Sequence, residues 1–259
     1  MKTVVANWKM NVGVRESVAL ARASLLTLRG RKVIPDLVIC PPFVALSEVR
    51  KVVARSSANV GAQNLFWEPS GSHTGETSSR MLLELGVSHV IIGHSERRVQ
   101  LGETDDMINK KVLHTLSEQM TPILCVGENK AQRDAGEARA VVEAQLSSAL
   151  RGVRPYGGDR LFIAYEPVWA IGTGESAVVG EVIEMHRFIR SVLEHLFPEA
   201  PVGQFAILYG GSVDGENAYG FLREVDVDGV LVGSASVKIN QFKEIVEAAA
   251  EVLEAQQLS

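Results

Sequence analysis

The segment AYEPVWAIGTG contains a single carboxylate, Glu166, at the end of an apolar run. Residues 161–165 are apolar enough to form a buried strand, and residues 168–171 add apolar bulk after it. Apolar surroundings raise the pKa of a carboxyl group, which makes it a better proton acceptor near neutral pH. The glycines that follow, Gly172 and Gly174, let backbone N–H groups approach a ligand, while apolar residues exclude water as a lid does. We therefore interpret Glu166 as a base that a lid covers.

The segment NWKMN places Asn7 and Lys9 directly after another apolar run. Side chains alternate along a strand, so Asn7 and Lys9 are expected on one side and Trp8 on the other. A lysine and an asparagine on one side could bind an anion and orient its oxygens. Lys9 could equally be a solvated cation at the end of a strand, and this segment alone leaves both interpretations open.

The segment IIGHSERR places His94 after a glycine, near the expected start of a helix. The helix dipole disfavours a protonated ring at that position, so a neutral imidazole could donate a hydrogen bond to a substrate carbonyl. Glu96, two residues further on, could lie on the same side and bind Lys9. The alternative is a buried histidine whose nitrogens bond to the backbone.

Two turns rich in glycine and serine, residues 209–212 and 232–236, follow two further apolar runs. Small-residue turns that open toward a helix bind phosphate through their N–H groups. A single turn of this composition is weak evidence, but two at successive strand ends are stronger. The sequence has no HExxH, CxxC, Walker-type or GxSxG motif, so we predict neither a metal site nor a cofactor.

These groups together favour proton abstraction next to a carbonyl on a small phosphorylated substrate. Glu166 would take the proton, and His94 with Lys9 would stabilise the enediolate that forms. The phosphate would lie at the two small-residue turns.

Elements that recur along the whole chain must position these groups. Eight short β-rich runs are continuous apolar segments, as expected of strands buried on both faces of a parallel sheet. They are residues 3–6, 37–40, 59–62, 89–92, 122–126, 161–165, 205–209 and 229–232. Segments with helical spacing lie between them, at residues 16–28, 105–119, 138–150, 182–196 and 242–253. The acidic pair at 105–106 is typical of a helix start, and Gly30 and Gly86 of helix ends.

Eight βα units in about 250 residues predict an α/β fold, a closed (β/α)₈ barrel with eight parallel strands and outer helices. A doubly wound open sheet is the alternative that the pattern leaves open. No linker or low-complexity tract interrupts the chain, so we expect residues 1–259 to form a single barrel domain. Active sites of such barrels lie at the carboxyl ends of the strands, which is where all the groups above occur.

The composition excludes several other classes of protein. The chain has 26 Lys and Arg against 31 Asp and Glu, a net charge of −5. This balance argues against nucleic-acid binding and against a polybasic membrane surface. No segment is long and apolar enough for a transmembrane helix or a signal peptide, so a cytoplasmic protein is expected. Cys40 and Cys125 both fall in strand-like runs and are expected as buried free thiols.

The same segments resemble the signature segments of the triosephosphate isomerase family. NWKMN, GHSERR, AYEPVWAIGTG, YGGS and DGVLVGSAS occur in the order of that family and extend from Asn7 to Ser236. GAQN, HTGE and CVGE are similar to secondary segments of the family. The resemblance implies interconversion of dihydroxyacetone phosphate and D-glyceraldehyde 3-phosphate, in glycolysis and gluconeogenesis, without a cofactor.

The resemblance also implies roles for individual residues. Glu166 would be the base, His94 the electrophile and Lys9 the cation that faces the enediolate. Asn7 and Ser95 would support them, and Glu96 would be their electrostatic partner. The N–H groups expected to hold the phosphate are those of Gly172, Ser212, Gly233 and Ser234.

A homodimer is a further implication of the resemblance. The loop around HTGE would enter the neighbouring subunit, with Thr74 at its tip near Asn7 and Lys9 of the other chain. Arg98 and Glu76 are the residues we expect to form salt bridges between this loop and the rim.

Four positions depart from the usual family pattern. The far hinge of the lid reads Glu175-Ser176-Ala177 where a basic residue is common, which concerns the kinetics of the lid rather than the chemistry. His73 replaces a common phenylalanine, Ser234 a common glycine, and Ser79 stands near a common proline. The backbone N–H of Ser234 remains, so phosphate binding is expected to survive.

Two other functions remain open at the level of the sequence. One is isomerisation of a longer ketose phosphate, against which the ordinary length of residues 168–174 argues. The other is phosphosugar binding without catalysis, because a fold alone does not fix a function. The presence of Lys9, His94 and Glu166 argues against it, since a binding protein needs no base.

Overall fold

Eight parallel strands close into a barrel in the computed structural model of this chain, which describes residues 1–154, 160–170, 177–201 and 203–258. Each strand pairs with its neighbours in chain order, and β8 pairs with β1 to close the sheet. The strands are β1 (Thr3–Asn7), β2 (Asp36–Cys40), β3 (Asn59–Ala62), β4 (His89–Ile92), β5 (Thr121–Val126), β6 (Leu161–Tyr165), β7 (Phe205–Tyr209) and β8 (Gly229–Val232). The predicted barrel is confirmed, and the alternative of an open doubly wound sheet is wrong.

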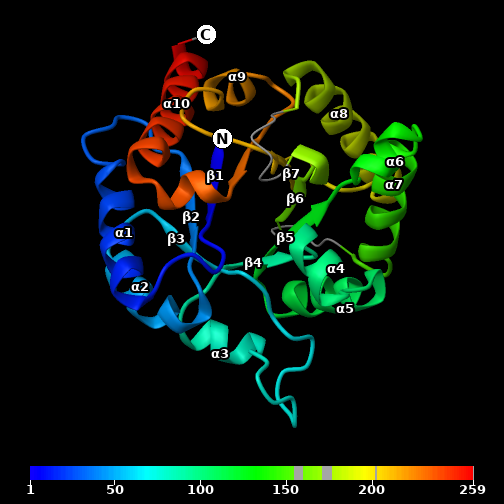
Figure 1. Cartoon of the computed structure of the whole chain (residues 1–259), viewed down its shortest axis with the longest axis horizontal. Coiled ribbons are helices and arrows are strands. Elements are labelled where there is room, and N and C mark those ends of the chain that lie inside the picture. The colour runs from blue at the N-terminus through cyan, green and yellow to red at the C-terminus, as the bar shows by residue number, and fades with distance from the viewer. Residues whose placement is uncertain (155–159, 171–176, 202, 259) are drawn as a thin grey trace.

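Helices surround the strands in a ring (Figure 1). The longer ones include all five that the periodicity predicts, with ends that agree or differ by up to five residues. The helices are α1 (Val14–Leu26), α2 (Leu46–Val53), α3 (Ser79–Glu84), α4 (Ser95–Leu101), α5 (Asp105–Ser117), α6 (Lys130–Asp134), α7 (Ala138–Ala149), α8 (Val179–Leu196), α9 (Ala218–Leu222) and α10 (Ile239–Leu258). Short 3₁₀ helices occur at Phe43–Ala45, Val168–Ala170 and Ser234–Val237. None of the described helices is both long and apolar enough to cross a bilayer.

Local signals in the sequence explain where helices begin and end. The side chain of Thr104 accepts a hydrogen bond from the Met107 N–H, and Asp105 and Asp106 occupy the first turn of α5 next to the positive end of its dipole. Gly86 follows α3 with a φ of 68°, a left-handed conformation that glycine adopts without strain. The predicted helix start at 105 and the predicted stop at Gly86 are therefore confirmed.

Two apolar layers make up the core, as a barrel requires. Alternate strand residues such as Val5, Phe162 and Leu208 fill the barrel interior, together with the thiols of Cys40 and Cys125. The other strand faces pack against the surrounding helices in a larger cluster. Because both faces of every strand are covered, the strands are continuously apolar and the two cysteines are buried and free, as predicted.

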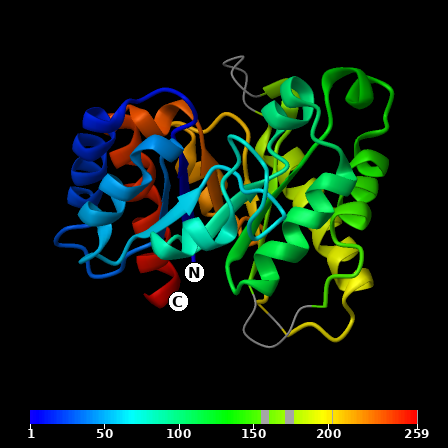
Figure 2. The same cartoon turned by 90° about the horizontal axis from the view of Figure 1, so that it is seen from below.

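The barrel has two distinct ends. Figure 2 shows the barrel from the side, with both chain termini at the end where the strands begin. The opposite end carries the loops that follow the strands. From it the segment between β3 and α3 extends away from the body of the molecule (Figure 1). Every residue from 71 to 76 in this segment is exposed.

Candidate active site

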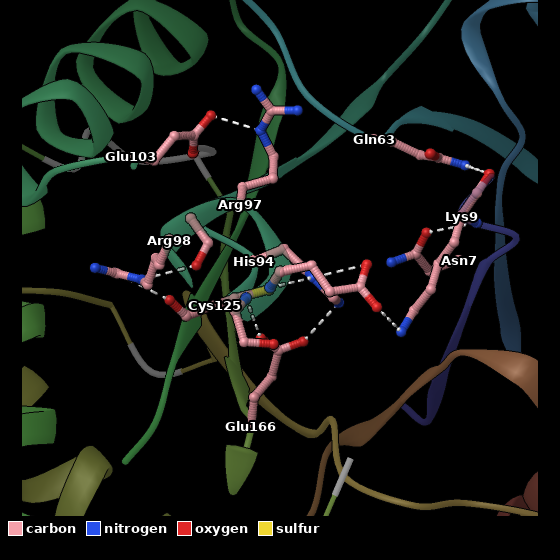
Figure 3. A network of polar contacts seen from close by, with 12 residues as sticks. Asn7, Lys9, Gln63, His94, Arg97, Arg98, Glu103, Cys125 and Glu166 are labelled. Carbon is pink, nitrogen blue, oxygen red and sulfur yellow. Dashed lines mark hydrogen bonds and ion pairs between the residues drawn. The ribbon is translucent and has the colours of Figure 1, made fainter. Parts of the chain in front are cut away.

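The strand ends enclose a cavity of about 390 Å³, which we call the mouth cavity. Its walls come from the ends of β1, β4, β6, β7 and β8, five separate segments of the chain. It is lined by Asn7, Lys9, Asn11, His94, Glu96, Glu166, Gly210, Gly211, Ser212, Val213, Leu231, Gly233 and Ser234. Figure 3 shows how several of these side chains point toward one another. Apart from Ser95, every described residue that was predicted to touch the substrate or to partner Lys9 lies on this wall. Gly172 lies outside the described residues.

Lys9 reaches the mouth cavity through a left-handed turn. The strand β1 ends at Asn7, and Lys9 has a φ of 51°. The Lys9 N–H donates to the Asn7 side-chain oxygen over 3.1 Å, and the Gln63 amide donates to the Lys9 carbonyl over 2.9 Å. Asn7 and Lys9 do share a cavity, as predicted. The reason is the left-handed turn at Lys9 and not the alternation of side chains along a strand, because β1 has already ended. These two bonds hold a conformation that a non-glycine residue rarely adopts.

The ammonium group of Lys9 pairs with Glu96. Its Nζ lies 2.6 Å from Glu96 Oε1, and the two side chains are 21% and 41% exposed. Glu96 belongs to the first turn of α4, where the helix dipole favours a carboxylate. Glu96 is the partner that the sequence predicts for Lys9. The ion pair excludes the interpretation of Lys9 as an unpaired, solvated cation.

His94 caps the N-terminus of α4. Gly93 turns the chain out of β4 with a φ of 68°, and the His94 Nδ1 accepts the N–H of Glu96 over 3.2 Å. An accepting Nδ1 is unprotonated, so the ring hydrogen is assigned to Nε2. Nε2 lies 3.0 Å from Glu166 Oε1. His94 is therefore a buried histidine with a donor available at the wall of the mouth cavity.

The pKa of His94 reflects two opposing effects. Burial lowers the pKa, because it disfavours the charged ring, but the adjacent Glu166 carboxylate outweighs burial and holds the pKa above its ordinary value. In this conformation the carboxylate is thus the main partner of the imidazole. A ligand that separates the two groups would remove the cause of the rise.

Glu166 follows β6 directly and is 2% exposed. Its Oε2 accepts the Ser95 N–H over 2.9 Å, and its Oε1 faces His94. Burial raises the pKa of Glu166, but His94, the Ser95 N–H and Lys9 together hold it below its usual range. The expected rise in pKa is wrong for this conformation, because the carboxyl group lies among hydrogen-bond donors rather than against apolar side chains.

Glycine at 127 allows the chain after β5 to approach Glu166. A Cβ at Gly127 would lie 1.7 Å from the Glu166 carbonyl oxygen, which no side chain can occupy. The Glu166 N–H also donates to the Val126 carbonyl over 2.7 Å. The backbone of the carboxylate is thus fixed on both sides.

The apolar segment after Glu166 is only partly described. Residues 168–170 form one 3₁₀ turn, and the Trp169 indole donates to the buried carboxylate of Glu128 over 2.9 Å. At the far side, the Ala177 N–H donates to the Tyr209 hydroxyl over 3.4 Å. The lid residues Gly172, Glu175 and Ser176 lie outside the described residues.

The two small-residue turns lie side by side across the mouth cavity. Ser212 follows β7, and Gly233 and Ser234 stand where β8 leads into a 3₁₀ helix. A Cβ at Gly233 would lie 3.5 Å from Lys9 Nζ, so the turn and the lysine are close neighbours. The Lys9 cation and the two small-residue turns thus lie together at one part of the cavity, and turns of this kind can bind a phosphate through their N–H groups.

Sequence reasoning missed several residues of the lining. Gly210 and Gly211 belong to the YGGS segment, and Asn11 is the second asparagine of NWKMN, so both motifs contained the signal. Leu231 carried no such signal, since it reads as one more core residue of β8.

A further cavity of about 660 Å³, which we call the lateral cavity, lies on the other side of Lys9. It is lined by Asn7, Lys9, Met10, Asn11, Pro42, Phe43, Gln63, Asn64, His94, Glu96, Arg97, Gln100 and Leu101. Arg98 is not among them. Its guanidinium pairs with Asp105 over 2.6 Å and donates to the carbonyls of Gly93 and Cys125. Arg97 does line the lateral cavity, and its guanidinium pairs with Glu103 over 2.5 Å.

The HTGE loop itself is ordered by its own contacts. The Phe66 N–H donates to the Thr77 carbonyl, and the Glu76 N–H to the His73 carbonyl. The His73 ring packs on Phe66 with centroids 4.4 Å apart, so it fills an aromatic position. Thr74 and Glu76 are exposed on this loop, and Ser79 at its base bonds to the His114 ring.

No group of three or more acidic, histidine or cysteine side chains that could hold a metal ion occurs among the described residues. The polar groups of the mouth cavity instead form a proton acceptor, a neutral donor and a cation. That set suits chemistry at a carbonyl carbon.

Comparison with known proteins gives a consistent result. The family model of triosephosphate isomerase matches residues 2–249. A triosephosphate isomerase of Caldanaerobacter subterraneus subsp. tengcongensis is 44% identical over 94% of this chain and 97% of its own length. The enzymes of the same name from Roseiflexus sp. (strain RS-1) and Aquifex aeolicus are 46% and 42% identical, over 94% and 95% of this chain and 95% and 98% of their own.

Proposed function

The chain belongs to the triosephosphate isomerase family and interconverts dihydroxyacetone phosphate and D-glyceraldehyde 3-phosphate, a step of glycolysis, and we propose that Glu166, His94 and Lys9 carry out this reaction. The observation that supports these roles most directly is the convergence of the three side chains on the mouth cavity, from three distant segments of the chain. A base, a neutral donor and a cation are what an enediolate intermediate requires.

Glu166 is the base in this proposal. The substrate carbon that loses its proton would lie in the mouth cavity, next to the carboxylate that already forms part of its wall. The carboxylate is ionised in the conformation seen, because its pKa is held low, and it is therefore ready to accept a proton. When Glu166 turns from Ser95 and His94 toward an apolar substrate carbon, it gives up those donors and becomes more basic.

His94 and Lys9 stabilise the enediolate. His94 Nε2 donates a hydrogen bond to the oxygen that was the carbonyl, while Lys9 supplies a positive charge near the same oxygens. Once Glu166 turns toward the substrate, the rise in the His94 pKa loses its cause, and burial together with the backbone N–H on Nδ1 keeps the ring neutral. Asn7 holds the Lys9 backbone, and the Ser95 N–H holds the resting carboxylate.

The phosphate of the substrate lies at the two small-residue turns. We assign its binding to the N–H groups of Ser212, Gly233 and Ser234, together with Gly172, which is outside the described residues. Anchoring a remote phosphate positions the reacting carbon and converts binding energy into orientation.

A homodimer completes the site in our proposal. The exposed loop at residues 71–76 would insert into the lateral cavity of a second copy, with Thr74 near Asn7 and Lys9. Met10, which is 96% exposed, would be covered there. The sequence suggests Arg98 as the partner of Glu76. Since Arg97 lines this cavity, we assign the salt bridge with Glu76 of the second copy to Arg97 instead.

A coupled assay of glyceraldehyde 3-phosphate conversion tests the proposal, with Glu166→Gln beside the wild type. We expect a fast wild type and a loss of about 10²–10⁴-fold in kcat for the variant, because the amide cannot accept the proton. Glu194→Gln, an exposed residue of α8, is the matched control and should behave as the wild type. A Glu166→Gln rate near that of the wild type would remove Glu166 from the role of base.

A further inference from the structure

A small cavity lies behind Glu166, on the opposite side of its carboxylate from the mouth cavity. This rear cavity, of about 150 Å³, is lined by Gly93, Ser95, Arg98, Val99, Cys125, Val126, Gly127, Asn129, Gln132, Gln145, Glu166 and Val168. Of the residues that the structure describes, Glu166 alone lines both cavities. In Figure 3, Arg98 and Cys125 lie on one side of Glu166, and Lys9 and Asn7 on the other.

The rear cavity suits water. Its volume is large enough to hold several water molecules. Buried water needs several polar partners, and Ser95, Gln132 and Glu166 are among the polar groups on this wall. Its outer edge reaches solvent at Asn129 and Val99, which are exposed; Val99 is 75% exposed.

The wall of the rear cavity is held by side chains that bond to the backbone. Gln145 accepts the Gly127 N–H over 2.8 Å and donates to the Gly127 carbonyl over 3.2 Å. Arg98 donates to the Gly93 carbonyl over 2.8 Å and to the Cys125 carbonyl over 3.3 Å. These bonds tie the segments after β4 and β5 in place, so the cavity is a fixed feature of the fold rather than a gap between loose side chains.

Glu166 has little other access to solvent once a substrate is bound. Its side chain is 2% exposed, and the substrate itself would fill the mouth cavity. A base that has taken a proton from the substrate would then be separated from bulk water on that side. In the conformation of the structure the rear cavity contacts the carboxylate from behind, and Gly127 on its wall lies against the Glu166 backbone.

We propose that the rear cavity is the route by which Glu166 exchanges its proton with solvent while the substrate occupies the mouth cavity. This inference rests on the proposed role of Glu166 as base. In D₂O, the protonated carboxyl group gives its hydrogen to D₂O and receives deuterium from it, forming HDO. One O–H and one O–D bond break and one of each forms, and no net charge moves. The exchanged carboxyl group then returns deuterium to the enediolate.

The two fates of the proton can be measured separately. Direct return of the substrate hydrogen gives unlabelled product, whereas exchange before return gives product with deuterium at the receiving carbon. The deuterium fraction of product formed in D₂O, measured by NMR in the initial phase of the reaction, reports how fast exchange competes with return. The isomerisation rate itself does not require exchange.

A removable plug at the outer edge of the rear cavity provides the test. Cys40 and Cys125 are buried, so a Val99→Cys variant carries a single exposed thiol. Benzyl methanethiosulfonate would place a ring at the edge, and a thiol reductant would remove it. Methyl methanethiosulfonate, at the same position, is a label too small to close the cavity. Val225→Cys is the matched control, because Val225 is 80% exposed and lies outside the rear cavity.

We expect the benzyl label at position 99 to lower the deuterium fraction at least threefold, with kcat within about twofold of the unlabelled variant. Reduction should restore the fraction, and neither the methyl label nor the benzyl label at position 225 should change it. Val99→Trp, which needs no label, should act in the same direction.

An unchanged deuterium fraction in both the benzyl-labelled variant and Val99→Trp would overturn the proposal, whatever happens to kcat. The proposed function fails by a different result, a Glu166→Gln variant as fast as the wild type. The two ideas can therefore fail independently.

Discussion

Two histidines lie at opposite ends of one strand. They are equally buried, but they differ in what they contact. His89 begins β4 and His94 follows its end, and they are 7% and 6% exposed. His89 packs beside Phe162, with ring centroids 5.5 Å apart, and its Nδ1 bonds to the Ser88 hydroxyl. His94 instead faces a cavity with a donor directed at Glu166. Burial alone thus does not identify a functional histidine.

The same contrast extends to lysines at the two ends of the barrel. Lys2, beside the start of β1, is 3% exposed and donates to the carbonyls of Glu224 and Val227. Lys9, beyond the end of the same strand, pairs with a carboxylate at the edge of two cavities. Lys2, at the end where the strands begin, thus satisfies backbone carbonyls. Lys9, at the opposite end, faces the cavities that a ligand would occupy, which agrees with the placement of active sites at the carboxyl ends of barrel strands.

The histidine pair gives the largest expected effect. His94→Gln should lower kcat by about 10²–10³-fold, because the enediolate loses a preorganised donor. His89→Gln should leave kcat within about twofold and instead lower the free energy of unfolding by about 1–2 kcal/mol. Coupled assays and urea unfolding of both variants provide the comparison. Equal loss of kcat in the two would mean that the ends of the barrel are not functionally distinct.

The lysine pair is expected to follow with a smaller loss of turnover. Lys9→Ala should lower kcat/KM by about 10²-fold and weaken binding of inorganic phosphate, since the cation lies beside the phosphate turn. Lys2→Met should leave both quantities close to those of the wild type, but it should cost about 1–3 kcal/mol of stability, because buried carbonyls lose their donor. An unaffected rate in Lys9→Ala would return Lys9 to a purely structural role.

In the proposed homodimer, only the end of the barrel that carries the mouth cavity contacts the second copy. Thr74→Arg should shift the protein toward monomer in analytical ultracentrifugation and lower kcat by about tenfold or more, since a bulky cation cannot fit beside Lys9. Arg80→Ala, which alters an exposed residue near the base of the loop, should change neither. A fully active monomeric wild type would show that the site is complete without the second copy.

The last expected effect is on stability at acidic pH and leaves turnover aside. Burial lowers the pKa of His89 to about 4, with Asp36 raising it and Arg160 lowering it in smaller measure, and burial also lowers the pKa of His186 to about 4. The unfolded chain binds these protons near pH 6.5, so each histidine lowers the stability of the folded state as the pH falls from about 6.5 to 4. At pH 5 the loss is about 2 kcal/mol for each.

Urea unfolding at pH 7 and pH 5 checks this contribution. His89→Gln should reduce the difference in unfolding free energy between the two pH values by about 2 kcal/mol. His195→Gln, an exposed residue in the last turn of α8, should leave the difference unchanged. If the unfolding free energy of His89→Gln changes between pH 7 and pH 5 as much as that of the wild type, then His89 binds a proton in the folded barrel as readily as in the unfolded chain.

Much of this architecture could be predicted from the sequence. Five of the eight strands have the predicted bounds, and β1, β2 and β5 differ by one residue at one end. Strands buried on both faces produce continuous apolar runs, which are easy to recognise. The shorter helices α2, α3, α6 and α9 were not individually predicted, since a turn or two of helix is too short to show periodicity. Most of the candidate site could also be predicted, because barrel enzymes place their chemistry just after strand ends.

What the sequence by itself determined is therefore the order of strands and helices and the identity of the groups at the rim. Only the tertiary structure decided how those groups meet. It turned Lys9 into a left-handed conformation, placed Arg97 rather than Arg98 beside the lateral cavity, and set Glu166 among donors that lower its pKa instead of raising it. The reason is distance along the chain. The Glu166 carboxylate bonds to Ser95, 71 residues away, and local sequence patterns carry no information on contacts that only the closure of the barrel creates.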